Sequence, residues 1–97
     1  MATLARPTEV EHLGNRVLKI TFTDGVVREL DFADTLHGHL AAIDNDTTFP
    51  QATIDPAARA VSWPNGIDLD PDVLHGDHPP ASGTAPTLIR QYQLTTT

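Results

Sequence analysis

The sequence contains no cysteine. Disulfide bonds, thiolate nucleophiles and cysteine-based zinc sites are therefore excluded, and the fold must depend on packing alone. A membrane-spanning helix needs roughly 20 consecutive apolar residues, and the sequence has no such segment. Charged side chains between Arg6 and Glu11 stand where a signal peptide would have its apolar region. We therefore expect a cytoplasmic protein that does not contact a membrane.

Basic side chains are also scarce. Six lysine and arginine residues stand against 13 aspartate and glutamate residues, which gives a formal net charge of −7. Affinity for nucleic acid comes chiefly from lysine and arginine contacts to phosphates, so we expect no direct binding of nucleic acid. A basic protein partner suits this charge better, because complementary charge accelerates association. At 97 residues the chain forms at most one small domain.

Groups for catalysis are few. The two serines, Ser62 and Ser82, have no Gly-x-Ser-x-Gly sequence around them. The six glycines are isolated from one another, so no glycine-rich loop is present to bind phosphate. Carboxylates gather at 68–72, but acid–base catalysis needs one carboxylate in an apolar pocket. We predict no catalytic residue and no cofactor, and we expect that the protein is not an enzyme.

A β-hairpin is the clearest structural pattern. Residues 16–23 alternate between apolar and polar, as in a strand with one buried face. The Asp24-Gly25 pair then predicts a tight turn, after which residues 26–32 return as a second strand. A short β-prone stretch at 8–10 precedes this hairpin, and residues 11–15 between them predict a turn.

The register of the hairpin depends on the length of its loop. A two-residue loop would place apolar side chains opposite polar ones. A three-residue loop over 23–25, with a glycine bulge, places Leu18 opposite Leu30 and Lys19 opposite Glu29. We therefore predict the bulged hairpin, because it pairs apolar with apolar residues and opposite charges with each other.

The middle of the chain predicts short elements. Residues 33–38 are compatible with one or two helical turns that end at the glycine of that segment. A polar loop then leads to Phe49, which we expect to be a buried anchor. Residues 51–54 and 58–63 predict a second hairpin around the turn at 55–57.

A turn and a short helix follow. Residues 63–66, Trp-Pro-Asn-Gly, have the composition of a β-turn. Asp70 is suited to cap a helix that starts at Pro71, and Leu69 and Leu74 have the spacing of a hydrophobic staple. We predict a helix from Pro71 to about residue 75.

Together these elements predict an α+β fold. We expect a mainly antiparallel sheet of four or five short strands, built from two hairpins, with one or two very short helices. Residues 1–76 form the predicted domain, and the proline- and threonine-rich residues 77–97 form a predicted mobile tail. Within that tail, residues 88–92 are the one segment expected to dock.

Several of these segments resemble one bacterial family, the domain of unknown function 2442. The resemblance is carried by residues 20–25, 27–31, Phe49 and 61–74 and covers roughly residues 7–75. Its most specific part is the Trp-Pro-Asn-Gly-x-Asp-Leu-x-Pro sequence, whereas the tail departs from the family pattern.

The resemblance implies a small α+β domain without an accepted catalytic activity. It also implies that some relatives are fused to a helix-turn-helix domain, for which this chain has no room, so a DNA-related role would need a partner. Many relatives are encoded beside another small uncharacterised protein, as in toxin–antitoxin pairs. Our leading hypothesis is therefore a non-enzymatic interaction module, the acidic half of such a pair, that binds a small basic protein. A homodimer is left open.

Two sets of residues are candidates for a site. The predicted interaction surface lies in and after the Trp-Pro-Asn-Gly turn and consists of Trp63, Asn65, Asp68 and Asp70. A lone tryptophan at the end of a strand usually anchors the core, and the polar three suit turns and caps. The alternative function is binding of a metal or small ligand by the imidazoles of His37, His39, His75 and His78.

Overall fold

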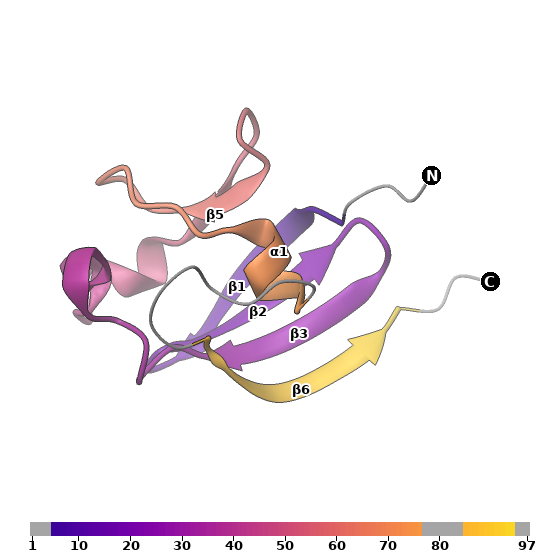
Figure 1. Ribbon diagram of the computed structural model, residues 1–97, viewed down its shortest axis with the longest axis horizontal. Coiled ribbons are helices and arrows are strands. Elements are labelled where there is room, and N and C mark those ends of the chain that lie inside the picture. Colours follow the sequence, from indigo (N-terminus) through magenta and orange to yellow (C-terminus); the bar gives the residue numbers. More distant parts are fainter. Residues whose placement is uncertain (1–4, 77–84, 95–97) are drawn as a thin grey trace.

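The computed structural model describes residues 5–76 and 85–94 (Figure 1). A four-stranded antiparallel sheet has the order β1-β2-β3-β6 and consists of β1 (Pro7–Gly14), β2 (Val17–Phe22), β3 (Val26–Asp31) and β6 (Thr87–Gln93). A separate two-stranded sheet consists of β4 (Thr53–Asp55) and β5 (Ala60–Ser62). The helices are the 3-10 helices η1 (Gly38–Ile43) and η2 (Phe49–Gln51) and the α-helix α1 (Pro71–His75). This is the α+β fold with few short helices that the sequence predicts.

The β2–β3 hairpin has the predicted register. Leu18 pairs with Leu30, and Lys19 pairs with Glu29. The three-residue loop closes with Gly25 at a φ of +85°. Only glycine adopts this conformation readily, and a Cβ at this position would also lie 2.6 Å from Nε2 of Gln93.

Strand β1 is longer than the sequence predicts. The predicted turn over 11–15 is wrong, because residues 11–14 continue the strand and only Asn15 and Arg16 form the turn. Glu11 pairs with Lys19 and His12 with Leu18 in the β1–β2 ladder. Pairing with a neighbouring strand therefore overrides the local preference for a turn.

The helical turns predicted over 33–38 are replaced by a turn at residues 33–35. The Asp31 carboxylate accepts a hydrogen bond from the Ala33 N–H at 2.9 Å, and the Thr35 hydroxyl donates to the Phe32 carbonyl at 3.1 Å. Such side-chain bonds compete with helix formation. Gly38, predicted as the end of a helix, is instead the first residue of η1.

The second hairpin and the helix are confirmed. In β4–β5, Ile54 pairs with Val61 across a four-residue loop, 56–59. The α1 helix begins after Asp70, whose carboxylate accepts the Asp72 N–H at 2.9 Å. The helix ends at Gly76, which has a φ of +96°.

One core joins these elements. The core cluster consists of the buried residues Ala5, Leu18, Ile20, Phe22, Leu30, Phe32, Leu36, Ile43, Phe49, Val61, Trp63 and Leu74. Figure 1 shows α1 across β1 and β2, and Leu74 of α1 belongs to the same cluster as the apolar face of β2. Each fully buried large apolar side chain contributes roughly 1.5–3 kcal/mol. The segment from residue 32 to 75 therefore covers one face of the four-stranded sheet.

Strand β6 comes from the predicted tail. It pairs with β3 in antiparallel orientation, and six of its seven residues are exposed. The segment 88–92, predicted to dock, lies within this strand. The boundary predicted at residue 76 adjoins residues 77–84, which lie outside the described part of the chain. Within the described residues, no helix is long and apolar enough to cross a membrane.

Candidate functional site

The structure places Trp63 in the core and not on a surface. Its side chain is 3 % exposed, and its indole N–H donates to the Phe49 carbonyl at 2.9 Å. The two aromatic rings lie 5.9 Å apart. Trp63 of the predicted interaction surface therefore lies in the core, where it packs beneath the neighbouring turn.

The other three residues of the predicted interaction surface are exposed. Asn65 and Asp70 have local structural roles: the Asn65 side-chain oxygen accepts the Ile67 N–H at 3.2 Å, and Asp70 caps α1. Asp68 forms an isolated bridge with Ser62, and its carboxylate makes no hydrogen bond or ion pair with a described residue. Of the two carboxylates, that of Asp70 caps a helix, so that of Asp68 has the greater freedom to meet a ligand.

The four histidines proposed as metal ligands do not form a described site. His37 is exposed before η1, the side chain of His39 is not described, and His78 lies outside the described residues. His75 packs its ring against Phe22, with the ring centroids 4.8 Å apart. Within the described residues, no group of three or more potential metal ligands occurs.

His75 connects α1 to the tip of the β2–β3 hairpin. Its Nε2 lies 2.7 Å from Oδ2 of Asp24, and its side chain is 14 % exposed. Burial raises the Asp24 pKa, but hydrogen bonds from the Val26 N–H and from His75 outweigh burial and hold this pKa below its ordinary value. This histidine therefore stabilises the fold as a partner of a carboxylate.

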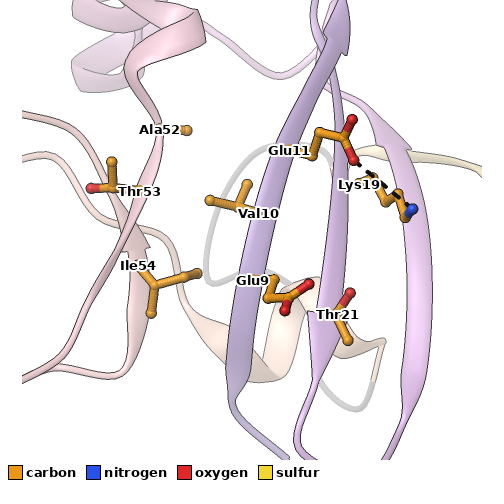
Figure 2. Close-up of a pocket in the computed structure, with 8 residues that line it drawn as sticks. All are labelled: Glu9, Val10, Glu11, Lys19, Thr21, Ala52, Thr53 and Ile54. Atoms are coloured by element: carbon orange, nitrogen blue, oxygen red, sulfur yellow. Dashed lines mark ion pairs between the residues drawn. The ribbon is translucent and has the colours of Figure 1, made fainter. Parts of the chain in front are cut away.

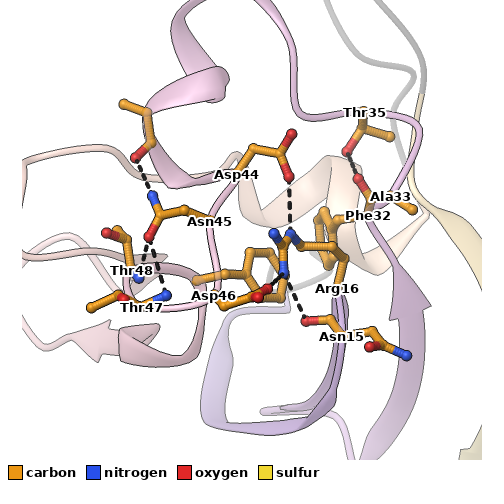
Figure 3. A network of polar contacts seen from close by, with 12 residues as sticks. Asn15, Arg16, Phe32, Ala33, Thr35, Asp44, Asn45, Asp46, Thr47 and Thr48 are labelled. Atoms are coloured by element: carbon orange, nitrogen blue, oxygen red, sulfur yellow. Dashed lines mark hydrogen bonds and ion pairs between the residues drawn. The ribbon is translucent and has the colours of Figure 1, made fainter.

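Arg16 forms a polar network that the sequence did not indicate (Figure 3). Its Nε lies 2.9 Å from a carboxylate oxygen of Asp44, and its Nη1 lies 3.0 Å from one of Asp46. These two carboxylates raise the pKa of Arg16 above its already high ordinary value. The guanidinium also lies 5.6 Å from the centre of the Phe49 ring. Arg16 thus connects the β1–β2 turn to the loop after η1. The only sign of this network in the sequence is the spacing of Asp44 and Asp46, which places two carboxylates close together.

A groove of about 480 Å³ lies beside the edge strand β1 (Figure 2). Its lining includes Glu9, Val10 and Glu11 of β1, Lys19 of β2, and Ala52 and Ile54 from the β4 segment. This volume falls within the range of ligand pockets in proteins. None of these residues was a candidate from the sequence, because the groove depends on the placement of β4 beside β1.

The groove has an acidic side and an apolar side. In Figure 2, Val10 points from β1 toward Ala52 and Ile54, whereas Glu9 and Glu11 lie on the other side of the strand. This follows from the alternation of side chains along a strand. The groove therefore offers carboxylates and aliphatic groups to one ligand, and its lining also includes the hydroxyl groups of Thr21 and Thr53.

Most cations of the described chain are held by internal partners. Arg6 pairs with Asp72 at 3.2 Å, and Arg90 pairs with Glu29 at 3.8 Å. Lys19 approaches Glu11 only to 3.9 Å, and the Glu11 side chain is 65 % exposed. The negative charge near the groove is therefore only weakly neutralised from within the protein.

Most of the chain matches one known protein family. The family model described as "Protein of unknown function (DUF2442)" matches residues 7–77. The chain belongs to this family. The DUF2442 segment extends from β1 through α1 and includes the whole groove, whereas β6 lies outside it. Neither the curated proteins nor the solved structures contain a match to the chain.

Proposed function

We propose that this DUF2442 protein is a non-enzymatic interaction module whose acidic surface binds a small basic protein. The observation that carries the proposal is the distribution of charge. Glu9, Asp34 and Asp68 are exposed and make no ion pair with a described residue. Arg6, Arg16 and Arg90, in contrast, already have carboxylate partners within the fold. A partner rich in lysine or arginine would supply the missing positive charge.

The side chains of the described residues support a role in binding more than one in catalysis. Ser62 is half-buried in β5 and forms no hydrogen bond with a described histidine. Asp24 has a lowered pKa, which is the opposite of what a general acid needs near neutral pH. We propose that binding proceeds without direct contact to nucleic acid, since the same carboxylates would repel phosphates.

The partner we propose is the small protein encoded beside the gene, in an arrangement like that of an antitoxin and its toxin. This part rests on the gene pairing implied by the family resemblance. A basic partner of this kind fits an acidic chain with a single small domain. One surface would supply the binding energy, and the opposite charges would accelerate the association.

Co-expression of the full chain with the product of the adjacent gene tests this proposal. We expect a complex that elutes from size-exclusion chromatography earlier than either protein alone. We also expect its association rate to fall as salt rises, because exposed charges are screened beyond about 8 Å at 0.15 M salt. The chain run alone shows whether a homodimer forms instead. Separate elution of the two proteins at low salt would refute the proposal.

A further inference from the structure

The outer edge of β1 lies open beside the groove. β1 is the first strand in the sheet order, so within the described residues this edge has no hydrogen-bonded strand partner. β4 lies next to it but belongs to the other sheet. An unpaired strand edge can accept an extended segment from another protein, and the side chains of such a segment then alternate between the two faces.

The two sides of the β1 edge differ in chemistry. Glu9 and Glu11 are two positions apart on the strand, which separates their Cα atoms by roughly 7 Å, and both carboxylates are exposed. Val10 between them faces the opposite way and packs with Ile54 at the margin of the core. An extended segment along this edge would therefore meet two carboxylates on one face and aliphatic side chains on the other.

Lys19 weakens the acidic side only slightly. Its ammonium lies 3.9 Å from Glu11, at the limit of an ion pair, and its backbone also pairs with Glu29 in the β2–β3 ladder. Glu9 has no cationic partner among the described residues. Arginine or lysine side chains of a partner could therefore form ion pairs with both carboxylates, and the Lys19 ammonium would compete only for Glu11.

We propose that the groove beside β1 binds an extended basic segment of the partner, in which two arginine or lysine side chains flank an aliphatic one. The cations pair with Glu9 and Glu11, and the aliphatic side chain packs against Val10 and Ile54. The stems of the basic residues cover apolar surface while their charged ends stay in water. This inference rests on the proposed function and assigns that function to one surface.

A short peptide tests the groove without the natural partner. The probe is the capped peptide Thr-Arg-Val-Arg-Thr, added to the full chain while amide chemical shifts are recorded. We expect saturable shifts concentrated at residues 9–11 and 52–54. The capped peptide Arg-Arg-Val-Thr-Thr has the same composition and charge but places its arginines on opposite faces, so we expect it to bind more weakly. Equal binding of both peptides, or shifts spread over the surface, would overturn the proposal.

Matched charge variants separate the groove from general attraction. Glu9→Gln with Glu11→Gln should weaken peptide binding about tenfold, because it removes both charge-assisted contacts. Asp34→Asn with Asp68→Asn removes the same charge elsewhere, and binding should stay within about twofold of the parent. Equal losses in the two double variants would show that only net charge matters and would overturn the proposal.

Lys19→Gln provides a test of opposite sign. Removal of the competing ammonium should tighten peptide binding about two- to threefold, whereas a variant with a damaged groove would bind more weakly. Unchanged or weaker binding by a folded Lys19→Gln variant counts against the proposed geometry. The amide spectrum of each variant checks its fold in the same experiment.

The same variants distinguish the two proposals from each other. A complex with the adjacent gene product that tolerates Glu9→Gln with Glu11→Gln would leave the interaction function standing and reject the groove as its site. Absence of any complex would reject the partner, while the peptide titration would still decide whether the groove binds a basic segment.

Discussion

The two edge strands of the four-stranded sheet differ in how they are held. β1 alternates between exposed and half-buried residues, and Val10 packs against the core. β6 is almost entirely exposed and contributes no residue to the core cluster. β6 depends on backbone pairing with β3 and on polar contacts such as the Arg28–Gln91 hydrogen bond at 3.0 Å. β6 is therefore part of the sheet through its hydrogen bonds, although its side chains are not part of the hydrophobic core.

The family segment includes one of these two edges and not the other. β1 and the groove lie inside residues 7–77, and β6 lies beyond them. β6 pairs with β3 and forms one edge of the sheet. β1 forms the opposite edge, and the groove lies beside it. The proposed binding surface is therefore on the side of the sheet that is built into the core.

The strongest test of this comparison is Trp63→Ala, which removes the support beneath the β4–β5 side. We expect a loss of about 3–5 kcal/mol in the free energy of unfolding, as for other buried large-to-small substitutions. Urea denaturation followed by circular dichroism measures it. Trp63→Phe is the control: it keeps most of the packing and removes the indole N–H bond to Phe49, so its loss should be smaller.

Val10→Ala and Ile89→Ala compare the two edges directly. Val10 is half-buried against the core, so the loss of its two methyl groups should cost about 1 kcal/mol. Ile89 in β6 is 54 % exposed, and its replacement should change stability by less than about 0.5 kcal/mol. Equal losses in urea denaturation would contradict the distinction drawn between the edges.

Asp70→Ala tests α1, which is connected to both edges. Arg6, just before β1, pairs with Asp72 of α1, and Arg28 donates both to the Leu74 carbonyl and to Gln91 of β6. Loss of the N-cap should cost about 1 kcal/mol and speed amide hydrogen exchange in both β1 and β6. Asp68→Ala removes a neighbouring carboxylate that caps nothing, and its effect should stay within about 0.5 kcal/mol.

The smallest effect concerns pH at the hairpin tip, on the β6 side. The folded-state pKa of Asp24 is lowered, so its contribution to stability is present above the unfolded pKa of about 4 and is lost as pH falls through the folded value. Asp24→Asn should therefore flatten the fall in stability below pH 4, measured by urea denaturation across pH. His75→Gln should bring the Asp24 pKa, followed by carboxyl NMR, closer to its ordinary value. An unchanged pKa would show that the His75 contact contributes nothing.

The sequence alone predicts those elements whose stabilising contacts lie within one short segment of the chain. The Asp-Gly turn with its bulge at Gly25 and the apolar pairing of Leu18 with Leu30 specify the hairpin register within one short segment. The same holds for α1, because the cap, the first-turn proline and the terminal glycine all lie within residues 70–76.

The remaining features depend on segments that meet only in the folded chain. The length of β1 follows from its pairing with β2, and the groove follows from the approach of β4. The Arg16 network joins residues 28 and 30 positions apart. Histidine spacing suggested metal ligands, yet His75 is used for packing and for Asp24. Local patterns do not specify these long-range partners.

The hairpin tip has a consequence for the order of folding. β3 pairs on one side with β2, across a three-residue loop, and on the other with β6, where the Gln93 side chain donates to the Asp24 carbonyl 69 positions away. Hairpins with short loops close within roughly 1–10 μs, whereas distant pairings must first overcome the entropy of closing a long loop. We therefore expect the same strand to acquire its two neighbours at different times, with β6 completing the sheet after the core has formed.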